Sequence, residues 1–166
     1  MNNSPESHAI SLLVSNKPGA LIRIALVFAR RGYNIDSLVV SPATDEKFAR
    51  MTIVANGDKE TLEQIIKQLN KLVDVIHARD HTGEVMVDKE LALIKVQCPI
   101  EKRTEVLQIV EYFKAETVDL TEDTMMLQVT GDSERINSIL VMLNKYGVVD
   151  TVRSGKLIMS RGHATT

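Results

Sequence analysis

The segment GDKETLEQIIKQLNK, residues 57–71, decides the fold, because a second version of it, GDSERINSILVMLNK, occupies residues 131–145. Both versions begin with Gly-Asp-x-Glu, end with Leu-Asn-Lys and repeat apolar residues at helical spacing. Asp58 and Asp132 stand where an N-cap carboxylate would accept hydrogen bonds from the first helical turn. The repeat therefore indicates two copies of one supersecondary unit.

The pattern around this segment predicts the same order of elements in both halves. Apolar faces predict helices at about 21–28, 62–69, 106–113 and 136–143. Short β-rich runs predict strands at 10–14, 35–40, 51–54, 72–78, 91–96, 117–120, 125–129 and 148–152, with 157–159 as a candidate extra strand. The order βαββαβ occurs twice. It predicts an α+β protein of two consecutive ferredoxin-like units, each a four-stranded antiparallel sheet with two helices on one face.

The polar sequence HTGE, which begins at His81, interrupts the pattern between the halves. We expect a first domain at 8–80, a linker at 81–88 and a second domain at 89–162. A domain of about 75 residues buries only about 60% of its unfolded surface and is marginal alone. We therefore expect another copy of the chain to cover sheet faces or edges, in a homodimer.

Composition excludes several classes of protein. The chain of 166 residues is 44% hydrophobic and 25% charged, as in an ordinary soluble domain, and its net charge of −2 offers no basic excess to nucleic acid. No apolar run approaches the roughly 20 residues of a membrane span, and the polar start lacks the apolar core of a signal peptide. The single cysteine, Cys98, excludes a disulfide framework. We expect a cytoplasmic protein without nucleic-acid or membrane partners.

The first predicted helix begins differently from the others, with NKPGAL at 16–21. Pro18 suits the first helical position, where a missing N–H costs nothing, and Gly19 and Ala20 leave the next N–H groups uncovered. Such an open, positive helix end suits a carboxylate or phosphate, and Asn16 adds amide donors and an acceptor. A tight turn that simply needs Pro and Gly is the alternative. The second copy has no glycine there, so the anion site is predicted in the first copy only.

At the other end of the same helix, Gly32 is typical of a left-handed C-terminal residue, and Asn34 opens the next strand. The regions of Asn16 and Asn34 need not touch within one chain. They could meet across a dimer contact, where an amino acid would fit. Its carboxylate would face the helix start, and its ammonium group would face amide oxygens and carbonyls.

The residues of this region resemble a known family. NKPGAL at 16–21 and RRGYNIDSL at 30–38 resemble the ACT domain of acetolactate synthase (acetohydroxyacid synthase) small subunits. Further matching runs are RMTIV at 50–54, the stretch 63–73, ELALIKV at 90–96, RSG at 153–155 and the stretch 157–162. The RGYNIDSL run is specific to this family, whereas Pro-Gly-x-Leu alone would indicate only some ACT domain.

The resemblance implies a regulatory chain without catalytic residues, metal or cofactor of its own. Small subunits of the family bind a catalytic large subunit, which uses thiamine diphosphate, Mg²⁺ and usually FAD. That large subunit condenses pyruvate with pyruvate or 2-oxobutyrate in valine, isoleucine and leucine biosynthesis. The small subunits raise its activity and confer feedback inhibition by valine.

The resemblance also implies an effector site at the interface of paired ACT domains. By position, the valine carboxylate and part of its ammonium group would be taken by Asn16, Gly19, Ala20 and Leu21. The partner chain would supply Asn34 and Ile35. The valine side chain would lie against neighbours such as Leu21 and Ile35.

The same residues permit three other interpretations. RNA-recognition modules share the βαββαβ order, but the strand at 49–53 lacks the aromatics on which bases stack. A free-standing enzyme is disfavoured because His77 and His81 do not share a helix face, Cys98 has no nearby base, and no P-loop or Rossmann motif occurs. A stand-alone ACT sensor acting on another enzyme or regulator stays open, although the second copy argues against it.

Overall fold

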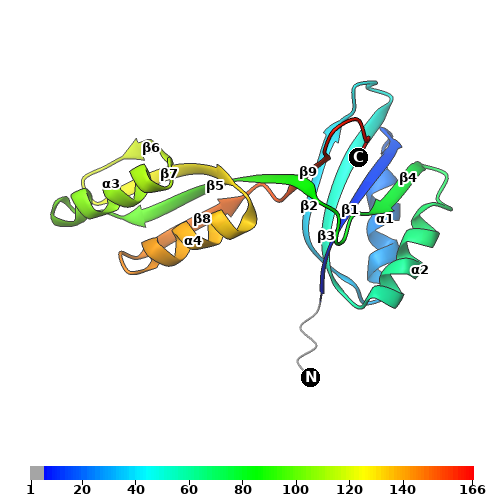
Figure 1. Cartoon of the computed structure of the whole chain (residues 1–166), viewed down its shortest axis with the longest axis horizontal. Coiled ribbons are helices and arrows are strands. Elements are labelled where there is room, and N and C mark those ends of the chain that lie inside the picture. The colour runs from blue at the N-terminus through cyan, green and yellow to red at the C-terminus, as the bar shows by residue number, and fades with distance from the viewer. Residues whose placement is uncertain (1–5) are drawn as a thin grey trace. The chain divides into compact units, whose positions relative to one another are not determined.

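The computed structural model describes residues 6–166. The chain forms two compact units, one reaching to Val87 and including Lys156–Thr166, the other spanning Asp88–Gly155. Each unit has the element order βαββαβ, with both helices on one face of an antiparallel sheet (Figure 1). The predicted α+β fold of two ferredoxin-like units is therefore confirmed.

The first unit is built around two central strands. Its sheet has the order β2-β3-β1-β4, so β1 and β3 are interior and β2 is an edge strand. The apolar faces of α1 and α2 pack on the sheet, with Ile10, Leu12, Phe28 and Ile65 at 0–1% exposure in the core. The elements are β1 (Glu6–Ser15), α1 (Ala20–Ala29), β2 (Asn34–Pro42), β3 (Phe48–Gly57), α2 (Lys59–Leu69) and β4 (Val75–Asp80).

The strand directions decide which residues share an end of this sheet. Both β1 and β2 are antiparallel to β3, so they run the same way. Ser15 at the end of β1 lies opposite Phe48, whereas Asn34 at the start of β2 lies opposite Asn56. The start of α1 and the β2–β3 hairpin therefore lie at one end of the sheet, and Asn34 lies at the other.

The second unit repeats the arrangement with the sheet order β6-β7-β5-β8. Its core contains Ile94, Leu127, Ile136 and Ile139, all fully buried. The elements are β5 (Met86–Gln97), a 3-10 turn (Ile100–Lys102), α3 (Arg103–Tyr112), β6 (Glu116–Leu120), β7 (Thr124–Gly131), α4 (Ser133–Asn144) and β8 (Val148–Arg153). The candidate extra strand exists as β9 (Leu157–Ser160), which pairs with β5 and belongs to the first unit.

The C-terminal segment, Lys156–Thr166, belongs to the first unit. The expected second domain, at 89–162, included most of this segment. The Arg50 guanidinium Nη1 donates to the carbonyl oxygen of Thr166 at 2.6 Å. The Thr166 hydroxyl in turn accepts the backbone N–H of Ser160 at 2.7 Å. These contacts tie the end of the chain to β3.

The repeated helix starts are capped as the sequence predicts. The carboxylate of Asp58 accepts the N–H of Thr61 at 2.8 Å, and that of Asp132 accepts the N–H of Arg135 at 2.8 Å. The Thr61 backbone hydrogen bond lowers the pKa of the Asp58 carboxyl below its usual value. The predicted strand at 72–78 is wrong at its start. Backbone bonds from Leu72 to Leu69 and from Val75 to Leu72 make a turn there, so β4 begins at Val75.

Candidate effector site

The start of α1 is held in place by backbone bonds to two neighbouring loops. The Ser15 N–H donates to the carbonyl oxygen of Asp74 at 2.7 Å, and the Asn16 N–H donates to that of Lys47 at 2.8 Å. The Ala20 N–H donates to Lys17 at 3.3 Å and closes a turn before the helix. These bonds fix where the helix end lies relative to the hairpin.

Gly19, not Pro18, marks the beginning of α1. The helix starts at Ala20, and Gly19 is its N-cap with φ +85°, a left-handed conformation that favours glycine. The expectation that Pro18 occupies the first helical position is therefore wrong. Pro18 instead lies in the turn before the cap, because the left-handed Gly19 separates it from the helical backbone.

The start of α1 leaves two N–H groups open. No side chain caps it, and its first intrahelical bond runs from the Arg23 N–H to the Gly19 carbonyl at 3.2 Å. Within residues 6–166, the N–H groups of Leu21 and Ile22 have no hydrogen-bond acceptor. Free N–H groups and the helix dipole together give this end a partial positive charge. The geometry is that of a helix start open to an anion.

Asn16 lies beside this open end and is exposed. Its amide nitrogen donates to the carbonyl oxygen of Glu46 at 3.0 Å, which holds the side chain against the hairpin. Its amide oxygen accepts no hydrogen bond from the described part of the chain. That oxygen is an acceptor of the kind that a ligand ammonium group needs.

Arg23 and Asp74 are the residues that sequence reasoning missed. The Arg23 Nε donates to the Asp74 carboxylate at 2.5 Å, and the side chains are 48% and 8% exposed, respectively. A Cβ placed on Gly19 would lie 3.0 Å from Arg23 Nη1, so the guanidinium reaches back over the helix start. Helical side chains lean toward the N-terminus, and an arginine in the first turn was the signal that could have found it.

The remaining predicted residues divide between the two ends of α1. Ala20 is buried and contributes backbone, and Leu21 is 41% exposed beside the open end. Asn34 and Ile35 lie at the far end of the sheet, where the Asn34 amide donates to the Asp36 carboxylate at 2.7 Å. One chain therefore brings Asn16, Gly19, Ala20 and Leu21 together, but it does not bring Asn34 or Ile35 to them.

The corresponding turn in the second unit has a different construction. Pro99 there adopts an extended conformation and leads into the 3-10 turn that precedes α3, with Glu101 inside it. Lys102, the N-cap of α3, is itself in the right-handed helical region. A left-handed glycine before the helix is thus a feature of the first unit, whereas both helices lack a side-chain cap.

The side chains considered for other chemistry are engaged elsewhere. His81 is buried, with Nε2 2.7 Å from the Ser11 hydroxyl and Nδ1 2.8 Å from the Glu84 carboxylate. Cys98 is fully buried. In the part of the chain that the structure describes, no three His, Cys, Asp or Glu side chains are grouped to hold a metal ion, and no helix is long and apolar enough to cross a membrane.

Comparison with known proteins matches both units to one family. The family model "AHAS small subunit-like ACT domain" matches residues 10–77, and "Small subunit of acetolactate synthase" matches residues 89–162. The chain is 45% identical over 162 residues to the probable acetolactate synthase small subunit of Methanothermobacter thermautotrophicus, covering 97% of this chain and 96% of that one. It is 40% identical over 159 residues to the small subunit of Mycobacterium bovis, covering 96% and 95%.

A solved structure matches over the same length. The crystal structure of the acetolactate synthase small subunit from Thermotoga maritima is similar with a TM-score of 0.85 and 34% identity, covering 96% of this chain and 99% of that chain. Sequence and structure thus agree over nearly the whole chain. The chain belongs to the acetolactate synthase small-subunit family and is a regulatory subunit with ACT domains.

Proposed function

We propose that this chain activates the catalytic large subunit of acetolactate synthase and confers feedback inhibition by L-valine, bound between the ACT domains of a homodimer. The observation that carries the proposal is the open, cationic start of α1 in a chain of this family. The chain has no catalytic role of its own. Thiamine diphosphate, Mg²⁺ and FAD would belong to the large subunit.

The chemistry of the α1 start fits an amino-acid carboxylate. The free N–H groups of Leu21 and Ile22 can donate to one end of the carboxylate, and the Arg23 guanidinium lies close enough to add its charge. Charge-assisted hydrogen bonds of this kind are about twice as strong as neutral ones. The free oxygen of Asn16 can accept from the ammonium group. Four groups that can contact an amino acid thus lie within one protomer.

The apolar surface and the open strand edge of the first unit support a dimer. β2 pairs only with β3 and leaves its outer edge unpaired within residues 6–166. α1 leads into β2, and its first turn exposes two large apolar side chains, Leu21 at 41% and Ile22 at 65%. An unpaired edge beside exposed apolar side chains is a surface that a second copy can cover.

A two-fold axis at this edge would complete the site. Antiparallel pairing of two β2 strands sets the start of one against the end of the other. The end of β2 at Pro42 lies at the same end of the sheet as the α1 start, because β1 and β2 run the same way. Asn34 and Ile35 of one protomer would then approach Gly19 of the other. This geometry supports the predicted division of the site between chains.

Valine bound across that interface would fix the relative placement of the two ACT domains. A ligand shifts an equilibrium only by its differential affinity for the two states, and the coupling is reciprocal. Allosteric couplings are typically about 1–3 kcal/mol. If valine changes the affinity of this chain for the large subunit, the large subunit changes its affinity for valine by the same factor. The proposal expects the valine-bound complex to be the less active form.

The test is a calorimetric titration of the purified chain, alone and with the large subunit, with L-valine. L-leucine and L-isoleucine serve as comparators. We expect saturable valine binding, and inhibition of the complex over the same concentration range. If the complex neither binds a branched-chain amino acid nor gains activity over the large subunit alone, the proposal is wrong.

Asn34→Ala is expected to weaken valine binding without preventing association with the large subunit. A hydrogen bond to a charged group contributes about 1.5–3 kcal/mol, which corresponds to roughly a 10- to 100-fold loss of affinity. Asn144→Ala is the matched control, since Asn144 is an exposed amide at the end of α4 in the second unit. Calorimetry of both variants decides the point, and an unchanged valine affinity in Asn34→Ala removes Asn34 from the site.

A further inference from the structure

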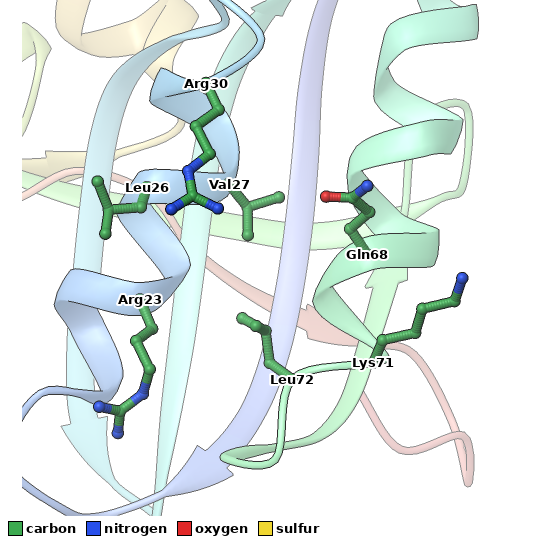
Figure 2. Close-up of a pocket in the computed structure, with 7 residues that line it drawn as sticks. All are labelled: Arg23, Leu26, Val27, Arg30, Gln68, Lys71 and Leu72. Atoms are coloured by element: carbon green, nitrogen blue, oxygen red, sulfur yellow. The ribbon is translucent and has the colours of Figure 1, made fainter.

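A groove of about 400 Å³ lies between α1 and α2 on the helical face of the first unit (Figure 2). Its apolar part is formed by Leu26, Val27 and Leu72, which come from α1 and from the turn after α2. Leu26 keeps 43% of its surface exposed there, whereas Val27 is buried at 7%. The complete lining is Arg23, Leu26, Val27, Arg30, Gln68, Lys71 and Leu72.

The polar part of the groove is cationic. Arg23, Arg30 and Lys71 line it, and no acidic side chain does. Arg23 and Arg30 project from the same side of α1, and the Arg30 guanidinium lies beside Leu26 and Val27 (Figure 2). Arg23 is paired with Asp74, but within the described range Arg30 and Lys71 have no ion pair or side-chain hydrogen bond. The chain as a whole carries a net charge of −2, so this positive charge is local.

The duplicated fold provides an internal reference for these cations. When Phe28 is matched with Phe113, both packed in their cores, Arg23 corresponds to Gln108 and Arg30 to Ala115. In the same match, Leu26 of the first unit corresponds to Glu111 of the second. The second unit folds without either arginine. Neither arginine of the groove is therefore required by the fold, whereas Lys71 has a counterpart in the second unit, Lys145.

We propose that the groove is the docking surface for an acidic segment of the large subunit, which rests on the function proposed above. Carboxylates of that segment would pair with Arg30 and Lys71, and an apolar side chain would cover Leu26. Arginine is enriched in protein interfaces, and complementary charge guides the association of partners. A second copy of this chain is a poor occupant, because a two-fold contact sets a patch against itself and would bring these cations together.

Arg23 connects this surface with the effector site. Its guanidinium lines the groove, and its Nη1 lies 3.0 Å from the position of a Cβ on Gly19. A valine carboxylate at the α1 start would draw the guanidinium toward itself and away from an acidic segment in the groove. Valine and the large subunit would then oppose each other's binding through one side chain, by the same factor in both directions.

The experiment measures the affinity of the full chain for the acetolactate synthase large subunit of the same organism, at low and high salt. The variants are Arg30→Glu and Lys71→Glu, and Lys59→Glu is the matched control at the opposite end of α2. We expect each groove variant to bind about tenfold more weakly, with a smaller loss at high salt, because reversed charges repel the acidic segment. Lys59→Glu should stay within about twofold of the wild type.

The outcomes distinguish a failure of the docking assignment from a failure of the proposed function. Retained L-valine binding by the groove variants shows that they are folded. If the wild type binds the large subunit and the groove variants bind equally well, the docking assignment is overturned and the proposed function stands. If the wild type does not bind the large subunit, both are overturned. A changed dimer mass in Arg30→Glu would assign the groove to a contact between copies and overturn the large-subunit assignment.

Discussion

Gly19→Asp is expected to abolish the response to L-valine while the chain folds and still activates the large subunit. The new carboxylate would stand at the N-cap of α1, beside the free N–H groups of Leu21 and Ile22, and the new Cβ would lie 3.0 Å from Arg23 Nη1. It would take the donors that the valine carboxylate needs. The loss of two charge-assisted hydrogen bonds predicts a decrease in valine affinity of about 100-fold or more. Calorimetry measures the valine affinity of the variant, and assays of the complex with and without valine measure its inhibition.

The backbone strain of this substitution needs its own control. A non-glycine residue in the left-handed region costs about 1–2 kcal/mol, wherever it lies. Gly83 has φ +79° and no atom within 4 Å of a new Cβ, so Gly83→Asp adds the same charge and the same kind of strain away from the site. We expect this control to keep full valine sensitivity. A Gly19→Asp variant that remains valine-sensitive would mean that the site has been placed wrongly.

Arg23→Gln is expected to weaken valine binding about 10- to 100-fold, because the site loses its only full positive charge among the groups described above. The change also leaves the Asp74 carboxylate, 8% exposed, without its ion-pair partner. Since Arg23 itself is half exposed, solvent screening limits the loss of stability to about 1–2 kcal/mol. Valine calorimetry and urea unfolding measure the two effects separately.

The double variant Arg23→Gln with Asp74→Asn distinguishes a binding role from a structural one. Replacing the unpaired Asp74 carboxylate by an amide should recover most of the lost stability, because burying a neutral amide costs less free energy than burying an unpaired charge. It should not recover valine affinity. If the double variant binds valine like the wild type, Arg23 acts only through the stability of the loop.

The fold could be predicted from local patterns because each pattern reports one physical requirement. Asp58 and Asp132 indicate helix starts because their carboxylates cap the first turn. The spacing of apolar residues indicates which helix faces pack into the core. The start of β4 could not be located, because Leu72 is apolar for its contact with the core and yet lies in a turn. Apolar character alone does not distinguish these two situations.

The site was only partly predictable, for two reasons. The sequence 16–21 shows the open helix start, but Arg23 meets Asp74 only because β4 follows α2 to the sheet edge beside β1. That contact depends on the tertiary fold. Asn34 could not be connected with Gly19 from one chain at all, since the two lie at opposite ends of α1. The direction of β2 suggests how they could meet, because antiparallel pairing of two β2 strands would bring Asn34 of one protomer near Gly19 of the other.

A mixed dimer tests the central claim, that each effector site combines the α1 start of one protomer with Asn34 of the other. Gly19→Asp chains and Asn34→Ala chains are unfolded together, refolded and titrated with L-valine. In a mixed dimer, one site would join the intact Gly19 of one chain with the intact Asn34 of the other. We expect mixing to restore wild-type affinity at one of the two sites. If the mixture binds no better than the separate variants, the site does not cross the dimer interface.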